Sequence, residues 1–255
     1  MRSLVLALAL ALLSPLPSAG PAAAGGVVTP PFSGTIFIDP DIITSDSPSV
    51  FRGLAYAGRD RRMVFDRRKD DWVTIRAFVF RLRFSDGRRA DAVVNPEFGS
   101  VRAARAQARR YAVVAGRLPA MLRRDVDELW IHRGRELYGG GNRSLLIHTG
   151  QTVEYMRAGI LEETLAHEGA HTSLDADLAS SAGWLAAQDA DPTFVSDYAQ
   201  ENPTREDVAE TIVPWLAVRY ARDRVDPVLV DLIEQAIPHR LAFLDERAFD
   251  LAPYA

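Results

Sequence analysis

The spacing of apolar and polar residues divides the chain into a β-rich first part and a helical second part. Residues 34–44 are rich in β-branched and aromatic side chains, and residues 72–84 alternate between two faces. Such alternation predicts a half-buried strand. The polar turn at 85–87 (Ser-Asp-Gly) then predicts a hairpin in which residues 88–98 form the returning strand.

The pattern changes after residue 98. Residues 100–124 have helical spacing with an interruption near Pro119, and two short strands are predicted at 127–134 and 144–150. From about residue 155 onward the chain has helical spacing, broken by polar stretches. This order of elements implies an α+β fold. We expect a β-rich N-terminal subdomain at 25–98, packed on a mostly helical domain with a short sheet at 99–255.

The chain begins with a segment that is typical of an export signal. Arg2 precedes the short apolar run 4–13, and three alanines at 22–24 supply the small residues that a signal peptidase requires. We therefore expect residues 1–24 to be a signal peptide and the protein to be secreted or periplasmic. With no cysteine in the chain, we expect neither a lipid anchor nor disulfides, and no later segment is apolar for long enough to cross a membrane.

Composition adds little about partners. The chain is 47 % hydrophobic and 25 % charged, with a formal net charge of −4, which is ordinary for a globular protein. Its basic clusters at 59–62 and 66–69 are interrupted by acids, so they indicate a solvated face and not a nucleic-acid-binding patch.

The segment 163–171, Glu-Thr-Leu-Ala-His-Glu-Gly-Ala-His, carries two of the five histidines in the chain. On a helix, residues four apart lie on one face, so His167 and His171 can present their imidazoles to one zinc ion. Glu168 is then placed to act as a general base on a metal-bound water. The alternative is a helix with an accidental pair of histidines.

A catalytic zinc needs a third protein ligand, and two acids compete for this role. Asp177 has the spacing of a His-Glu-x-x-His-x-x-Gly-x-x-His/Asp site, but Leu174 replaces the glycine that lets the chain turn. Glu206 is the other candidate, on a helix that Asn202-Pro203-Thr204 is expected to start. Glu210, one turn further on, can accept the free N–H of a ligand histidine.

The two motifs together resemble the gluzincin metallopeptidases. His-Glu-Gly-Ala-His is followed 35 residues after its last histidine by Glu-Asp-Val-Ala-Glu, and this pairing is most similar to the branch that includes the catalytic domain of anthrax lethal factor. The resemblance covers roughly residues 144–220 and implies a zincin-like fold with one zinc ion. It implies that His167, His171 and Glu206 are the zinc ligands and that Glu168 is the general base. Glu210 would be the outer carboxylate that accepts a hydrogen bond from a ligand histidine, and the Tyr198 hydroxyl would stabilise the oxyanion.

These observations predict an exported zinc peptidase that acts on peptides or proteins. One alternative is a zinc-containing, non-catalytic binding or toxin-like interaction protein of the same fold. Another is a structural α+β protein with an accidental motif. His148, on the strand at 144–150, is a structural residue in one interpretation and a cleft-lining residue in the other.

Overall fold

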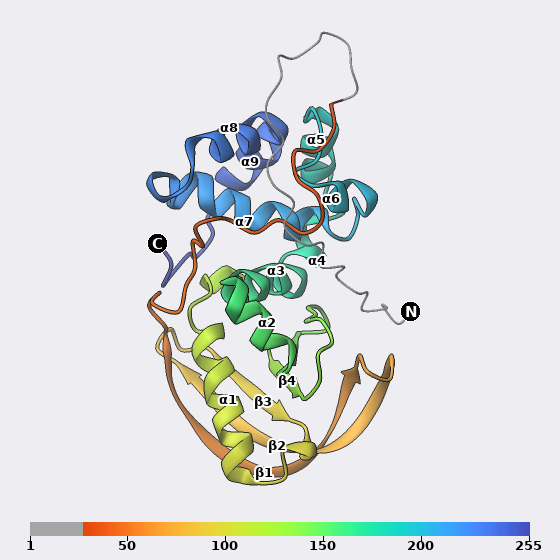
Figure 1. The fold of residues 1–255 in the computed structure, drawn as a ribbon, viewed down its shortest axis with the longest axis vertical. Helices are drawn as coiled ribbons and strands as arrows, with labels where there is room; N and C mark the ends of the chain where they lie inside the picture. Colours follow the sequence, from red (N-terminus) through yellow and green to blue (C-terminus); the bar gives the residue numbers. More distant parts are fainter. Residues whose placement is uncertain (1–27) are drawn as a thin grey trace.

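The computed structural model describes residues 28–255, so the expected signal peptide at 1–24 lies outside the described residues. Within them, a five-stranded sheet occupies one half of the molecule and most helices the other (Figure 1), which confirms the expected α+β class. The strands are β1 (Phe51–Asp66), β2 (Asp71–Phe84), β3 (Arg89–Val94), β4 (Glu128–His132) and β5 (Ser144–His148). The helices are α1 (Val101–Ala115), α2 (Gln151–Ala158), α3 (Leu161–Ser173), α4 (Asp175–Leu178), α5 (Ala182–Ala190), α6 (Asp197–Glu201), α7 (Asp207–Tyr220), α8 (Pro227–Ala236) and α9 (Pro238–Asp245), with short 3-10 helices η1 (Pro96–Phe98), η2 (Ala120–Arg123) and η3 (Arg222–Arg224).

The sheet has mixed topology. Its strand order is β1-β2-β3-β4-β5, with antiparallel pairing from β1 to β3 and parallel pairing from β3 to β5. The predicted hairpin is confirmed by β2 and β3, which pair from Phe78↔Val94 to Arg83↔Arg89. Because β3 also pairs with β4, the sheet crosses the expected boundary at residue 98, and both parts share one hydrophobic core.

The outer half of the β1–β2 hairpin extends beyond the other strands. β3 pairs only with the second half of β2, so residues 71–77 pair with β1 alone and form a two-stranded ribbon that bends out of line with the other strands (Figure 1). The ribbon packs against the sheet face opposite α1. Trp72 and Trp130 meet there edge to face, with ring centroids 5.4 Å apart, in a second apolar cluster.

The strand expected at 34–44 is absent from the described structure, and that prediction is wrong. Residues 32–43, here called the N-terminal strap, instead run in an irregular path over the helical half. Glu163 on α3 accepts the N–H groups of Ile38 and Ile42 at 2.9 and 2.7 Å. These isoleucines are buried, so the apolar pattern of the segment reflects packing on helices and not a place in a sheet.

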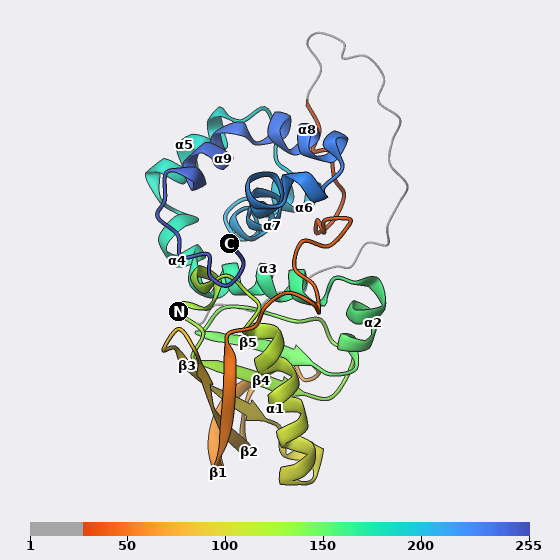
Figure 2. The same ribbon diagram turned by 90° about the vertical axis from the view of Figure 1, so that its left-hand side faces the viewer.

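Helix α3 lies at the centre of the molecule, between the sheet and α7 (Figure 2). Every residue from 161 to 170 is buried, which explains why this helix shows only a weak polar face. Gly169 permits the close approach of η2, because a Cβ at this position would lie 2.8 Å from the Leu122 carbonyl oxygen. None of the helices in residues 28–255 has the length and apolar character needed to span a membrane.

Candidate metal centre

Two neighbouring helices bring the three expected ligands together. His167 and His171 lie one turn apart on α3, and Glu206 immediately precedes α7. Nitrogen and oxygen atoms of the three side chains all lie within 4.8 Å of one another. The His171 Nε2 atom is 3.1 Å from Glu206 Oε2 and 3.1 Å from His167 Nε2, while His167 Nε2 is 3.5 Å from the same carboxylate oxygen.

A carboxylate lies behind each of the two imidazoles. Asp175 Oδ2 is hydrogen-bonded to His171 Nδ1 at 2.7 Å, whereas Glu210 Oε1 lies 3.5 Å from His167 Nδ1, an ion-pair distance without a hydrogen bond. An acceptor at Nδ1 favours the tautomer with its proton there, which leaves the Nε2 lone pair free for a ligand. Both Nε2 atoms then face a carboxylate oxygen, so electron-rich atoms converge on one point. Such an arrangement requires a cation or protons at its centre.

The electrostatics of the cluster agree with this requirement. Burial lowers the pKa of His171, but Asp175 and Glu206 outweigh burial and raise this pKa well above its usual value. For Glu206, burial is the largest single effect and raises the pKa, but the hydrogen bonds and charges of His167 and His171 together outweigh burial and lower the pKa. The site therefore stabilises positive charge on its inner side, and a divalent ion can replace the protons.

The carboxylate of Glu210 is fixed from two directions besides His167. Its Oε2 atom accepts hydrogen bonds from the Ser196 hydroxyl at 2.8 Å and from the N–H of Ile36 in the N-terminal strap at 3.2 Å. Burial raises the pKa of Glu210 to about 7, against the opposing effect of its donors. Glu210 therefore takes the place that the sequence predicts for an outer carboxylate.

Helix α7 begins later than the sequence predicts. The expected start at Asn202-Pro203-Thr204 lies in a turn, and the first helical residue is Asp207. The Pro203 carbonyl accepts a hydrogen bond from the Gln188 side chain at 3.1 Å, so it does not enter the helical ladder. Glu206 and Glu210 still lie one turn apart, since Glu210 N–H bonds to the Glu206 carbonyl at 2.8 Å.

Glu168 and Tyr198 are the two residues expected to act on substrate. Glu168 is buried, with 3 % of its surface exposed. The Thr172 hydroxyl donates to its backbone carbonyl, and no hydrogen bond from residues 28–255 reaches its carboxylate, which is therefore available. Tyr198 lies on α6, and its hydroxyl is buried without a hydrogen-bond partner in the described chain. Burial and the nearby charge of Glu206 raise the pKa of this hydroxyl, so it stays a hydrogen-bond donor at neutral pH.

Asp177, the alternative third ligand, is not a member of the cluster. It lies on α4, with 61 % of its side chain exposed, and pairs with Arg124 at 2.6 Å. Because Leu174 replaces the glycine, helical turns continue from α3 into α4 and the chain does not fold back under the histidines. Asp175 is the contact that sequence reasoning missed, and its position four residues after His171 was the available signal.

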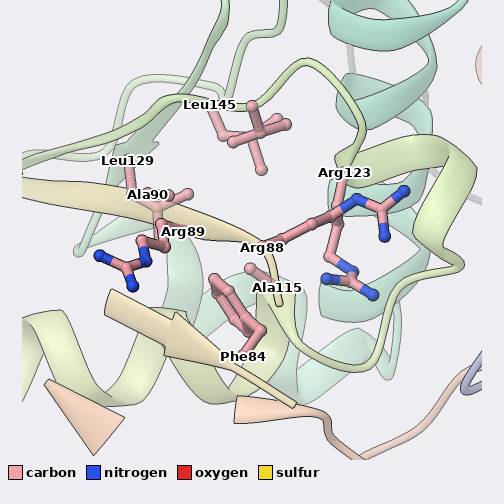
Figure 3. A pocket seen from close by; sticks show the side chains of 9 residues that line it. Phe84, Arg88, Arg89, Ala90, Ala115, Arg123, Leu129 and Leu145 are labelled. Atoms are coloured by element: carbon pink, nitrogen blue, oxygen red, sulfur yellow. The ribbon is translucent and has the colours of Figure 1, made fainter. Parts of the chain in front are cut away.

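The residues present fit a metal ion of the zinc type, since two imidazole nitrogens and one carboxylate oxygen are a common catalytic ligand set for zinc. A separate hollow lies at one end of the sheet, between Phe84, Ala115, Leu129 and Leu145 (Figure 3). Arg88 and Arg123 also line it, and none of the metal-cluster residues does.

No known protein family, curated protein or solved structure matches the chain.

Proposed function

We propose that this protein is an exported zinc-dependent peptidase of the gluzincin type, acting on peptides or proteins. The observation that carries the proposal is the convergence of His167, His171 and Glu206, each imidazole backed by its own carboxylate. A structural protein has no need for a cluster that concentrates lone pairs in this way. The buried, unpaired carboxylate of Glu168 on the same helix turn supplies what a purely metal-binding protein does not require.

The chemistry follows from the placement of the side chains. When bound, zinc supplies a Lewis acid and lowers the pKa of a coordinated water. Glu168 takes a proton from the attacking water and delivers it to the leaving amine. Tyr198 donates its hydroxyl hydrogen to the developing oxyanion. Asp175 and Glu210 hold the two imidazoles in their ligand tautomers.

Zinc analysis combined with digestion of a proteome-derived peptide library tests this function. Glu168→Gln removes the base and leaves the three ligands, so we expect full zinc content with hydrolysis reduced by orders of magnitude. Glu201→Gln, on the exposed part of α6, is the matched control and should behave as wild type.

The alternatives give different results in the same experiment. A wild-type protein that retains one zinc ion but cleaves no peptide supports the non-catalytic binding protein. A protein that retains no metal supports the accidental motif. Hydrolysis that persists in Glu168→Gln refutes the assigned base. Mass analysis of the exported chain then tests whether cleavage falls at residue 24, as the signal sequence predicts.

A further inference from the structure

A second group of side chains with buried, unpaired polar atoms lies outside the metal cluster, around the carboxyl ends of β4 and β5. It consists of Arg67, His132, His148 and Tyr155. Within the part of the chain that the structure describes, hydrogen-bond partners are lacking for all three guanidinium nitrogens of Arg67, both ring nitrogens of His148, His132 Nε2 and the Tyr155 hydroxyl. Buried polar atoms in native proteins are nearly always paired, so this concentration requires an explanation.

The guanidinium of Arg67 is the member of the group that most needs a counter-ion. A guanidinium stays charged at any accessible pH, and burying it without a counter-ion is costly. The neighbouring Asp66 is already paired with Arg68 at 2.8 Å, and Arg68 also holds Glu97 at 2.7 Å. No ion pair connects Arg67 to any acid of residues 28–255. A bound anion would supply the counter-charge that the described residues do not.

The two histidines are the most deeply buried members of the group. His132 and His148 are fully buried, and their rings stack with centroids 5.5 Å apart. Asn95 Nδ2 lies 2.9 Å from His132 Nδ1, which leaves Nε2 of His132 free. Burial, with a smaller effect from the charges of His132, Arg68 and Arg67, lowers the pKa of His148 to about 3. Both rings are therefore neutral near pH 7, and each can donate one hydrogen bond.

Tyr155 connects this group to the proposed catalytic site. Burial and then the charge of Glu168 raise the pKa of its hydroxyl, while the charge of Arg67 lowers it. The Tyr155 hydroxyl therefore lies within reach of the electrostatic fields of both residues. Arg67 belongs to the turn between β1 and β2, whose next residues, 68–70, are exposed. Tyr155 lies on α2, which packs against both β5, the strand of His148, and α3, the helix of Glu168.

We propose that Arg67, His148 and Tyr155 form a binding site for a carboxylate group of the substrate, either the C-terminal carboxylate of a peptide or an acidic side chain. A planar oxyanion matches the fork of a guanidinium and also accepts hydrogen bonds from an imidazole and a phenol. A cation is excluded by the charge of Arg67. The assignment to substrate depends on the proposed peptidase function, whereas anion binding itself does not.

Isothermal titration of the zinc-loaded protein with succinate and, separately, with inorganic phosphate tests the site without hydrolysis. We expect Arg67→Met to weaken succinate binding about tenfold to a hundredfold, the usual range for loss of a charged hydrogen-bond donor. Arg61→Gln, an exposed arginine on the same hairpin, is the control and should bind as wild type. Binding that is undiminished in Arg67→Met places the anion on the metal and overturns the proposal.

A structural role for Arg67 predicts a different stability. If the guanidinium awaits an anion, Arg67→Met should be as stable as wild type or more stable in anion-poor buffer, and should lose the anion-dependent rise in melting temperature. A structural arginine loses stability under both conditions, and that result refutes the site. If Arg67→Met does not fold, Tyr155→Phe gives the same comparison, with a smaller expected loss of anion binding.

The source of the carboxylate is resolved with substrate pairs. If cleavage is found, peptides with free and amidated C-termini, and with Glu or Gln at each position, should differ in kcat/KM for wild type and not for Arg67→Met. Succinate binding without any peptide preference assigns the site to a free anion and refutes the substrate role. If no peptide is cleaved but Arg67-dependent binding persists, the peptidase function fails and the anion site stands.

Discussion

Replacing Arg240 by methionine tests how firmly the start of α7, and with it Glu206, is held. Arg240 lies on α9 and is completely buried. Its guanidinium donates to Asp191 at 2.7 Å, to Asp207 and to the Thr193 carbonyl oxygen. Asp207 is the first residue of α7 and follows Glu206 directly, so this ion-pair network anchors the turn that presents the third ligand.

The size of the effect follows from the burial of all three charged groups. Removing one partner of a buried ion pair leaves an uncompensated charge and typically costs about 3–5 kcal/mol. Without Arg240, Asp207 keeps only the Gln188 side-chain amide, at 2.9 Å, and Asp191 keeps two backbone N–H donors. We therefore expect the free energy of unfolding to fall by about 4 kcal/mol. Displacement of the first turn of α7 should also weaken zinc retention by about tenfold.

Urea unfolding followed by circular dichroism measures the first effect, and competition with a zinc chelator measures the second. Arg222→Met is the control, because Arg222 is exposed and its ion pair with Glu234 should be worth less than about 1 kcal/mol. Adding Asp207→Asn to Arg240→Met should restore part of the lost stability, since it removes the unpaired carboxylate. A loss below about 1 kcal/mol, equal to that of Arg222→Met, would refute the reasoning.

Three further predictions concern the site and its surroundings. Glu206→Gln should weaken zinc retention far more than Asp177→Asn in a chelator competition, and the reverse order would favour Asp177 as third ligand. Gly140→Ala should lower both stability and activity, because its Cβ would lie 2.8 Å from a backbone carbon of α3. Gly53→Ala is the control, since its Cβ meets only ordinary contacts. If the two variants lose stability and activity equally, the loop at Gly140 shifts freely. The depressed pKa of His148, about 3, means that the unfolded state binds its proton first as pH falls below 6.5. Stability should therefore drop by about 3 kcal/mol between pH 6.5 and 4, and His148→Gln should flatten this fall in pH-dependent unfolding; an unchanged slope would show that His148 is already charged.

Local spacing predicted the parts of the structure that depend on neighbouring residues. The hairpin of β2 and β3, the helix that carries His167 and His171, and the proximity of Glu206 all followed from short patterns. The ligand cluster also required two distant segments to meet, and the complementary chemistry of the two motifs was enough to indicate that.

The sequence predictions were wrong where a segment makes its hydrogen bonds with residues far away in the chain. The isoleucines of the N-terminal strap have the spacing of a strand, but the amides of the strap bond to carboxylates on α3 and α7. The charged stretch 59–62 is largely solvated as expected, although it lies within β1 and pairs with β2. The same expectation is wrong for part of 66–69, because Asp66 is buried. The group around Arg67 depends on the bend of the β1–β2 ribbon, which no local pattern encodes.

The N-terminal strap also constrains the order of events during synthesis. Its backbone donors bond to Glu163 and Glu210, residues that follow 121 to 174 positions later in the chain. A growing chain therefore cannot complete its first segment until α7 has left the ribosome, and contacts of such long sequence separation make folding slow. The earliest of the described residues to be synthesised are therefore among the last to reach their native contacts.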